Sequence, residues 1–187
     1  DPRHAAARGA MLLGAHLAGA AIENSMLGAT HACANPLSAH YDMIHGIAIG
    51  VMLPHVIRFN AGHVGDAYGK LAEVAGLCQA NNPHGAERLA DYVTQLVELS
   101  GQPTRLRDCD VRTELIARMA AEAAKQWTGT FNPRPVSIAE FEELYSCAWE
   151  GPYDVRHTVG AAGPQMVPAG IRPGRHHCWR GQYPQLL

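Results

Sequence analysis

Aromatic residues are scarce in this sequence, and it has no excess of positive charge. Aromatic residues make up 6% of the 187 positions, whereas alanine carries much of the 47% apolar fraction and glycine adds 19 residues. Small side chains favour close helix–helix packing over a bulky aromatic core. The formal net charge of −2 and the pI near 6.6 leave no basic patch for phosphate groups. The sequence therefore gives no support to nucleic-acid binding.

Paired cysteine motifs are also absent. The five cysteines are odd in number, widely spaced and without a CxxC pair: Cys33, Cys78, Cys109, Cys147 and Cys178. This pattern is typical of reduced thiols in a cytosolic protein and implies neither a disulfide framework nor a zinc finger. We therefore expect a cytoplasmic location.

No apolar run in the sequence is expected to reach the length of a membrane span, and the best candidate is the apolar stretch after His45. Pro54, His55 and Arg58 interrupt that stretch before it reaches about 18 residues. The start, DPRHAAARG, lacks the apolar core of a signal peptide, and it also lacks an initiator methionine. We expect no membrane partner, and a chain that begins part-way through a longer polypeptide or follows processing.

Several catalytic signatures are missing as well. The sequence contains no HExxH, no pair of ExxH helices, no GxSxG, no P-loop and no GxGxxG. These absences argue against a zincin, a di-iron bundle, an α/β-hydrolase and a nucleotide-binding fold within this chain.

Helical periodicity dominates the first 150 positions. Apolar residues recur at three- and four-residue steps and predict helices over residues 4–24, 64–76, 84–100 and 112–127. A last helix is predicted to follow Ser137, which forms a capping box with Glu140 three positions later. No alternating run of β-branched residues competes with these helices. The predicted fold is all-α.

Histidines are concentrated in residues 25–60. His31 and Asn35 are four positions apart and share one face of a predicted helix, while His45 opens an apolar helix that we expect to be buried on every side. A straight helix would separate the two histidines by about 21 Å. We therefore predict a turn between them, supplied by Pro36, Ser38 and the Tyr41–Asp42 pair.

Two imidazoles that meet at such a turn form half of a metal site. Imidazole nitrogens suit zinc, iron and copper, and a catalytic ion takes about three or four protein ligands. Spacing alone leaves the alternative open that His31 and His45 are hydrogen-bonded core histidines. His176, His177 and Cys178 are close together near the end of the chain, but chance explains such a short cluster better.

Two segments resemble the iron-containing (group III) alcohol dehydrogenases, AGAAIENSMLGATHACANPLSAHYDMIHGIAIGVMLPHVIRFN and FNPRPVSIAEFEELYSCAW. The resemblance runs from about residue 5 to 149 and covers the C-terminal helical domain of that family, which has the dehydroquinate synthase-like fold. It implies a helical metal-binding domain over residues 1–150, followed by a Gly/Pro-rich irregular tail over residues 151–187. By the same resemblance, His31 and His45 bind the catalytic ion, iron(II) or zinc.

The resemblance also implies an activity. The metal acts as a Lewis acid on the oxygen of a small alcohol or aldehyde, and hydride passes between the substrate and NAD or NADP. Asn35 occupies the position of a third family histidine near the reacting centre, where it can orient a hydroxyl but cannot relay a proton. We place it as the catalytic residue.

The chain lacks other parts that the resemblance implies. The family's remaining ligands, an aspartate and a histidine one helical turn apart, lie upstream with the nucleotide-binding domain. Asp1 and His4 are too close to the His31 motif to align with that pair. The partner is then a missing N-terminal domain or a further copy in a homo-oligomer. The alternative function is a truncated, non-catalytic helical domain that binds metal weakly or not at all.

Overall fold

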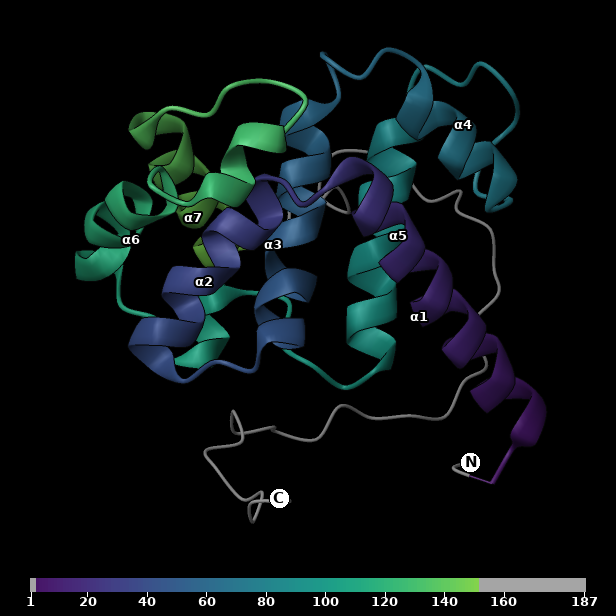
Figure 1. Cartoon of the computed structure of the whole chain (residues 1–187), viewed down its shortest axis with the longest axis horizontal. Helices are drawn as coiled ribbons and strands as arrows, with labels where there is room; N and C mark the ends of the chain where they lie inside the picture. The colour runs from purple at the N-terminus through teal and green to yellow at the C-terminus, as the bar shows by residue number, and fades with distance from the viewer. Residues whose placement is uncertain (1–2, 152–187) are drawn as a thin grey trace, which may run out of the picture.

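A computed structural model describes residues 3–151 of the protein as a bundle of α-helices with short 3₁₀ turns (Figure 1). The elements in chain order are α1 (Ala5–Ser25), α2 (Ala29–Tyr41), α3 (His45–Asn60), α4 (Ala67–Val74), α5 (Gly85–Leu99), η1 (Leu106–Cys109), η2 (Thr113–Leu115), α6 (Ile116–Ala123), η3 (Trp127–Phe131) and α7 (Ile138–Glu150). The all-α prediction is confirmed for these residues. The predicted tail, with His176, His177 and Cys178, lies outside them.

The core is formed where α2, α3, α6 and α7 pack against one another. Its largest buried side chains come from all four helices and from the preceding turns: Leu37, Met52, Leu106, Met119, Phe141 and Tyr145. Tyr145 is fully buried, and its hydroxyl donates a hydrogen bond of 2.7 Å to the backbone carbonyl of Cys33. This bond satisfies a polar group that would otherwise be costly to bury.

The capping box predicted at the start of the last helix is present. The Ser137 side chain accepts from the Glu140 backbone, and the Glu140 carboxylate accepts from the Ser137 backbone. The carboxylate also contacts Arg134, whose guanidinium lies over the Phe59 ring at 3.5 Å from its centroid. The cap therefore also fixes the start of α7 against the end of α3.

A second layer is formed by α5, which packs against the outer side of α3, and by α4, which packs against α5. Arg58 of α3 reaches across to Glu87 and Asp91 of α5, at 2.7 Å in each case. Gly85, at the start of α5, lies so close to α4 that an added Cβ would be 2.6 Å from the Cα of Gly69. Glycine at this position therefore sets the distance between the two helices.

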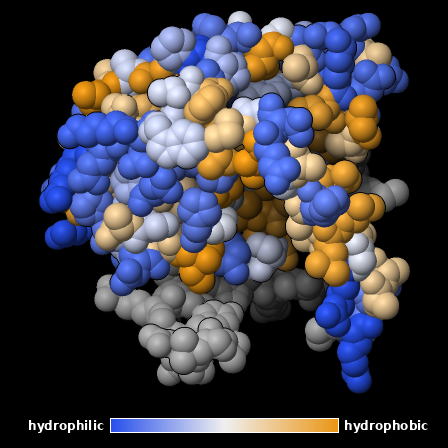
Figure 2. All heavy atoms as spheres, viewed as in Figure 1, coloured by the Kyte–Doolittle hydropathy of each residue, from blue (hydrophilic) through white to orange (hydrophobic). Residues whose placement is uncertain are grey.

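The first helix differs from the other α-helices of residues 3–151, because none of its residues is buried. Its large apolar side chains are exposed: Met11, Leu12, Leu13, Leu17 and Ile22. Figure 2 shows apolar residues at the right of the molecule, where Figure 1 places α1. A Cβ added to glycine 9, 14 or 19 would meet no atom within 4 Å outside the backbone of α1. The helix extends from the bundle as an arm.

The arm corrects the expectation about apolar runs. In length and composition, α1 is the candidate for a membrane span among the described residues, with a mean hydropathy of 1.3. The sequence analysis instead places the best candidate for a membrane span in the stretch that forms α3. Core helices of soluble proteins and signal sequences satisfy the same criterion. The absence of a membrane partner stays a prediction.

Candidate functional site

The turn between the two predicted ligands is formed at the end of α2. Asp42 takes a left-handed conformation with φ of 50°, and the Ser38 hydroxyl donates to the Met43 carbonyl at 3.0 Å. Pro36, in contrast, lies inside α2 and does not end it. The predicted turn is therefore confirmed at Asp42 and wrong at Pro36. Ser38 also lies inside α2 and contributes to the turn through its side chain. A proline costs one helical hydrogen bond, and here the buried packing of the helix outweighs that loss.

His31 and His45 meet across this hairpin. Their ring centroids are 5.2 Å apart, and the ring planes are inclined by 46°. His31 comes from the first turn of α2 and is half-buried, whereas His45 is the first residue of α3 and is exposed. We expected the helix that His45 opens to be buried on every side, and that expectation is wrong at its start, because His45 and Gly46 are both exposed.

The electrostatics of the pair favour a neutral imidazole at His31. Burial lowers the pKa of His31 below its usual value, and the neighbouring His45 lowers it further. A neutral ring keeps a lone pair for a metal ion. Two imidazoles suit iron(II) or zinc as donors and could supply part of a coordination shell. Within residues 3–151, no group of three or more histidine, cysteine or acidic side chains could hold an ion.

Asn35 lies one helical turn after His31 and is also half-buried. Its amide nitrogen donates to the side-chain oxygen of Gln126 at 3.0 Å. A second polar contact joins the same two parts of the chain, between His40 and Glu122 at 2.7 Å. The hydrogen bond from His40 lowers the pKa of Glu122, and Arg118 lowers it further. Sequence reasoning missed both contacts, because no local pattern links positions 82 or 91 residues apart.

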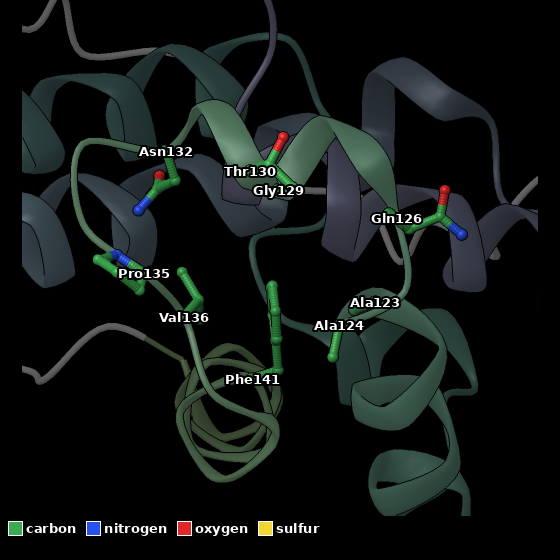
Figure 3. Close-up of a pocket in the computed structure, with 9 residues that line it drawn as sticks. All are labelled: Ala123, Ala124, Gln126, Gly129, Thr130, Asn132, Pro135, Val136 and Phe141. Carbon is green, nitrogen blue, oxygen red and sulfur yellow. The ribbon is translucent and has the colours of Figure 1, made fainter.

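Gln126 borders a cavity of about 480 Å³ between α6, η3 and α7, with the lining residues Ala123, Ala124, Gln126, Gly129, Thr130, Asn132, Pro135, Val136 and Phe141. Figure 3 shows the Phe141 side chain between Val136 and Ala124, and the Gln126 amide pointing away from all three. In η3, Thr128 is buried, and its hydroxyl has no hydrogen-bond partner among the described residues. A buried hydroxyl of this kind usually has a water or a ligand as its partner.

Two other histidines have structural roles. His55 is buried in α3, and burial with the nearby charge of Arg58 lowers its pKa to about 4. His55 is therefore a neutral histidine of the core, the role that was the alternative for His31 and His45. His4 caps α1 by accepting a hydrogen bond from the Ala7 backbone at 3.1 Å. His4 therefore has a structural role at the N-cap of α1.

Comparison with known sequences shows what the chain resembles. The sequence profile for the Fe-containing alcohol dehydrogenase family, C-terminal, matches residues 1–149. The lactaldehyde reductase of Escherichia coli K12 is 37% identical over 141 residues, which cover 74% of this chain and 37% of the reductase. The 1,3-propanediol dehydrogenase of Klebsiella pneumoniae is 34% identical over 145 residues, which cover 76% of this chain and 38% of that enzyme.

Solved structures agree with the sequence matches. A crystal structure of 1,3-propanediol oxidoreductase superposes with a TM-score of 0.61 at 32% identity, covering 65% of this chain and 32% of that one. An alcohol dehydrogenase from Oenococcus oeni superposes with a TM-score of 0.64 at 27% identity, covering 71% and 35%. The chain therefore spans less than two-fifths of the length of these relatives.

Proposed function

Because this chain belongs to the iron-containing alcohol dehydrogenase family and matches its C-terminal region, we propose that it forms the metal-binding half of a small-alcohol dehydrogenase. His31 and His45 hold an iron(II) or zinc ion, and the polypeptide that completes the site supplies the remaining ligands and the binding site for NAD or NADP. The substrate is a small alcohol or aldehyde, like those in the names of the relatives. The cytosolic location expected from the cysteines is part of the same proposal.

The proposal rests chiefly on the pair of imidazoles, 5.2 Å apart between ring centroids at the hairpin of α2 and α3. His31 is half-buried, and the burial that lowers its pKa favours the neutral ring, whose lone pair can bind an ion. The hairpin brings both rings together before any ion binds. When bound, the cation supplies Lewis-acid polarisation of the substrate oxygen. Asn35, one helical turn from His31, orients the substrate hydroxyl by a hydrogen bond and moves no proton.

The metal assignment predicts the effect of single substitutions. His31→Ala and His45→Ala each remove one imidazole. Loss of a residue that only hydrogen-bonds to a metal ligand already lowers metal affinity by about 10- to 100-fold. We expect each variant to weaken Zn²⁺ or Co²⁺ binding by at least that factor, as measured by calorimetry and by the visible absorption of Co²⁺.

The matched control is His63→Ala, which removes an exposed histidine that follows α3. We expect this variant to bind the ions as the unchanged chain does. Unchanged affinity in both His31→Ala and His45→Ala would exclude these ligand assignments.

A second function is favoured by one observation: the described residues contain no third ligand near the pair. In this alternative the chain is a non-catalytic helical domain that binds metal weakly or not at all. The same titration separates the two functions. Binding of Zn²⁺ that depends on His31 and His45 supports the dehydrogenase, and binding that neither substitution changes supports the alternative.

A further inference from the structure

A polar side chain from a distant part of the sequence holds Asn35 in place. The Asn35 amide nitrogen donates to the Gln126 side-chain oxygen at 3.0 Å, although the two residues are 91 positions apart. Resting on the proposed function, we infer that Gln126 is a positioning residue, which fixes the Asn35 amide so that its carbonyl oxygen is presented to the ligand held at His31 and His45.

The backbone on both sides of Gln126 makes it a rigid support. The backbone nitrogen of Gln126 donates to the Ala123 carbonyl at 3.0 Å, and its backbone carbonyl accepts from the Gly129 backbone nitrogen at 3.0 Å. The adjoining turn η3 packs directly on α2, since a Cβ on Gly129 would be 3.5 Å from the Cβ of Ala32. Figure 3 shows the Gln126 amide directed away from the Phe141 side of its cavity. The side chain is therefore free to reach α2.

The pairing determines which chemistry Asn35 offers. A side-chain amide has two donor hydrogens on nitrogen and an acceptor oxygen. Gln126 engages the nitrogen, while within residues 3–151 the Asn35 oxygen accepts no hydrogen bond. Because residues four apart on a helix are neighbours, the Asn35 side chain shares one face of α2 with His31. It suits a ligand that brings a hydrogen to donate, such as a neutral hydroxyl or a carboxamide. A carboxylate, which only accepts, is disfavoured.

The orientation of the amide can be measured in the isotope-labelled chain by NMR, without metal or substrate. We expect nuclear Overhauser contacts from the Asn35 amide protons to the Gln126 side-chain methylenes. Contacts to the His31 ring in their place would show that the amide faces the other way, and would overturn the inference.

Substitution at Gln126 tests the support. Gln126→Ala removes the acceptor, so the Asn35 amide protons should exchange with solvent about fivefold faster, as expected for the loss of one hydrogen bond. Gln126→Glu keeps an acceptor of the same shape and should restore slow exchange. Gln102→Ala, in the exposed segment after α5, makes the same chemical change and should have no effect. Equal exchange rates in all four proteins would overturn the inference.

The pKa of a carboxyl group at position 35 is a second measurement, and a general loss of stability would not change it in the same way. Asn35→Asp introduces a carboxyl group whose pKa is measurable by NMR. Combining it with Gln126→Glu places two carboxyl groups within hydrogen-bonding distance, which should raise that pKa by about one unit or more. An unchanged pKa would show that the side chains do not meet.

Failure of this inference is distinguishable from failure of the proposed function. Gln126 is not a metal ligand, so Gln126→Ala should bind Zn²⁺ as tightly as the unchanged chain. Loss of Zn²⁺ binding in Gln126→Ala would contradict the positioning role. Absence of Zn²⁺ binding in the unchanged chain would instead contradict the dehydrogenase proposal and leave the amide measurements to be judged by themselves.

Discussion

At the scale of single residues, Asn132 connects three segments of the chain. It exchanges two hydrogen bonds with Asn60, at 3.0 and 2.8 Å, and its oxygen accepts from the backbone of Ala29 at the start of α2. Its nitrogen also donates to the carbonyl of Arg134 at 2.9 Å. Because Asn60 is almost fully buried, it has no water to replace these bonds.

These hydrogen bonds predict that even a substitution of the same shape at Asn132 destabilises the folded protein. Asn132→Asp keeps the shape of the side chain but replaces its donor nitrogen with an acceptor, which then faces two further acceptors. We expect it to lower the free energy of unfolding in urea by about 1–3 kcal/mol. Asn24→Asp, whose nitrogen donates to a carbonyl on the exposed helix α1, is the control and should cost much less. Equal losses for the two variants would show that Asn132 is not a special connection.

At the scale of helices, glycines with opposite surroundings should respond in opposite ways. Gly85→Ala places a methyl group 2.6 Å from the backbone of Gly69, so α4 and α5 must separate. We expect a loss of about 1–3 kcal/mol in the free energy of unfolding. Gly14→Ala meets nothing within 4 Å and should increase the helicity of α1, since alanine favours a helix interior by about 1 kcal/mol over glycine.

Circular dichroism and urea unfolding distinguish these two outcomes. The first substitution should shift the unfolding transition to lower urea, and the second should raise the helical signal with little shift. A Gly85→Ala protein as stable as the unchanged chain would mean that α4 is loosely held against α5.

At the scale of the whole molecule, stability should depend on pH through His55. Its pKa is about 4 in the folded protein and about 6.5 when unfolded, so the unfolded chain binds more protons between these values. Stability is therefore complete above pH 6.5 and is lost as the pH falls towards 4. His55 alone should account for a loss of about 2 kcal/mol between pH 7.5 and 5. The lowered pKa of His31 acts in the same direction.

Urea unfolding at these two pH values measures the effect. His55→Gln should flatten the pH dependence, whatever its effect on stability at pH 7.5, and His63→Gln should leave the dependence unchanged. An identical slope in the two variants would contradict the assignment to His55.

The exposed arm leads to another prediction for the whole molecule. Because no residue of α1 is buried, removal of residues 1–25 should change the free energy of unfolding of the bundle by less than about 0.5 kcal/mol. It should also reduce self-association, since five large apolar side chains are removed with the arm. A marked loss of stability would show that α1 packs on the bundle in solution.

The amino-acid sequence by itself determined the helices, the capping box at Ser137 and the meeting of His31 with His45. Helical periodicity and capping depend on residues three or four positions apart, which are visible in any short window. The turn at Asp42 then brings His31 and His45 together, and these two are near enough in the chain for one hairpin to join them. The family resemblance assigned the ligand role to these two positions.

Only the tertiary structure decided that Pro36 stays inside α2, that His45 is exposed, that α1 has no buried residue, and that Gln126 and Asn132 hold the site and the helix ends. Exposure depends on which helices lie against a given face, and that is set by packing across the whole bundle. Contacts such as Asn35 with Gln126 join residues 91 positions apart, and no local pattern carries information about a partner at that distance.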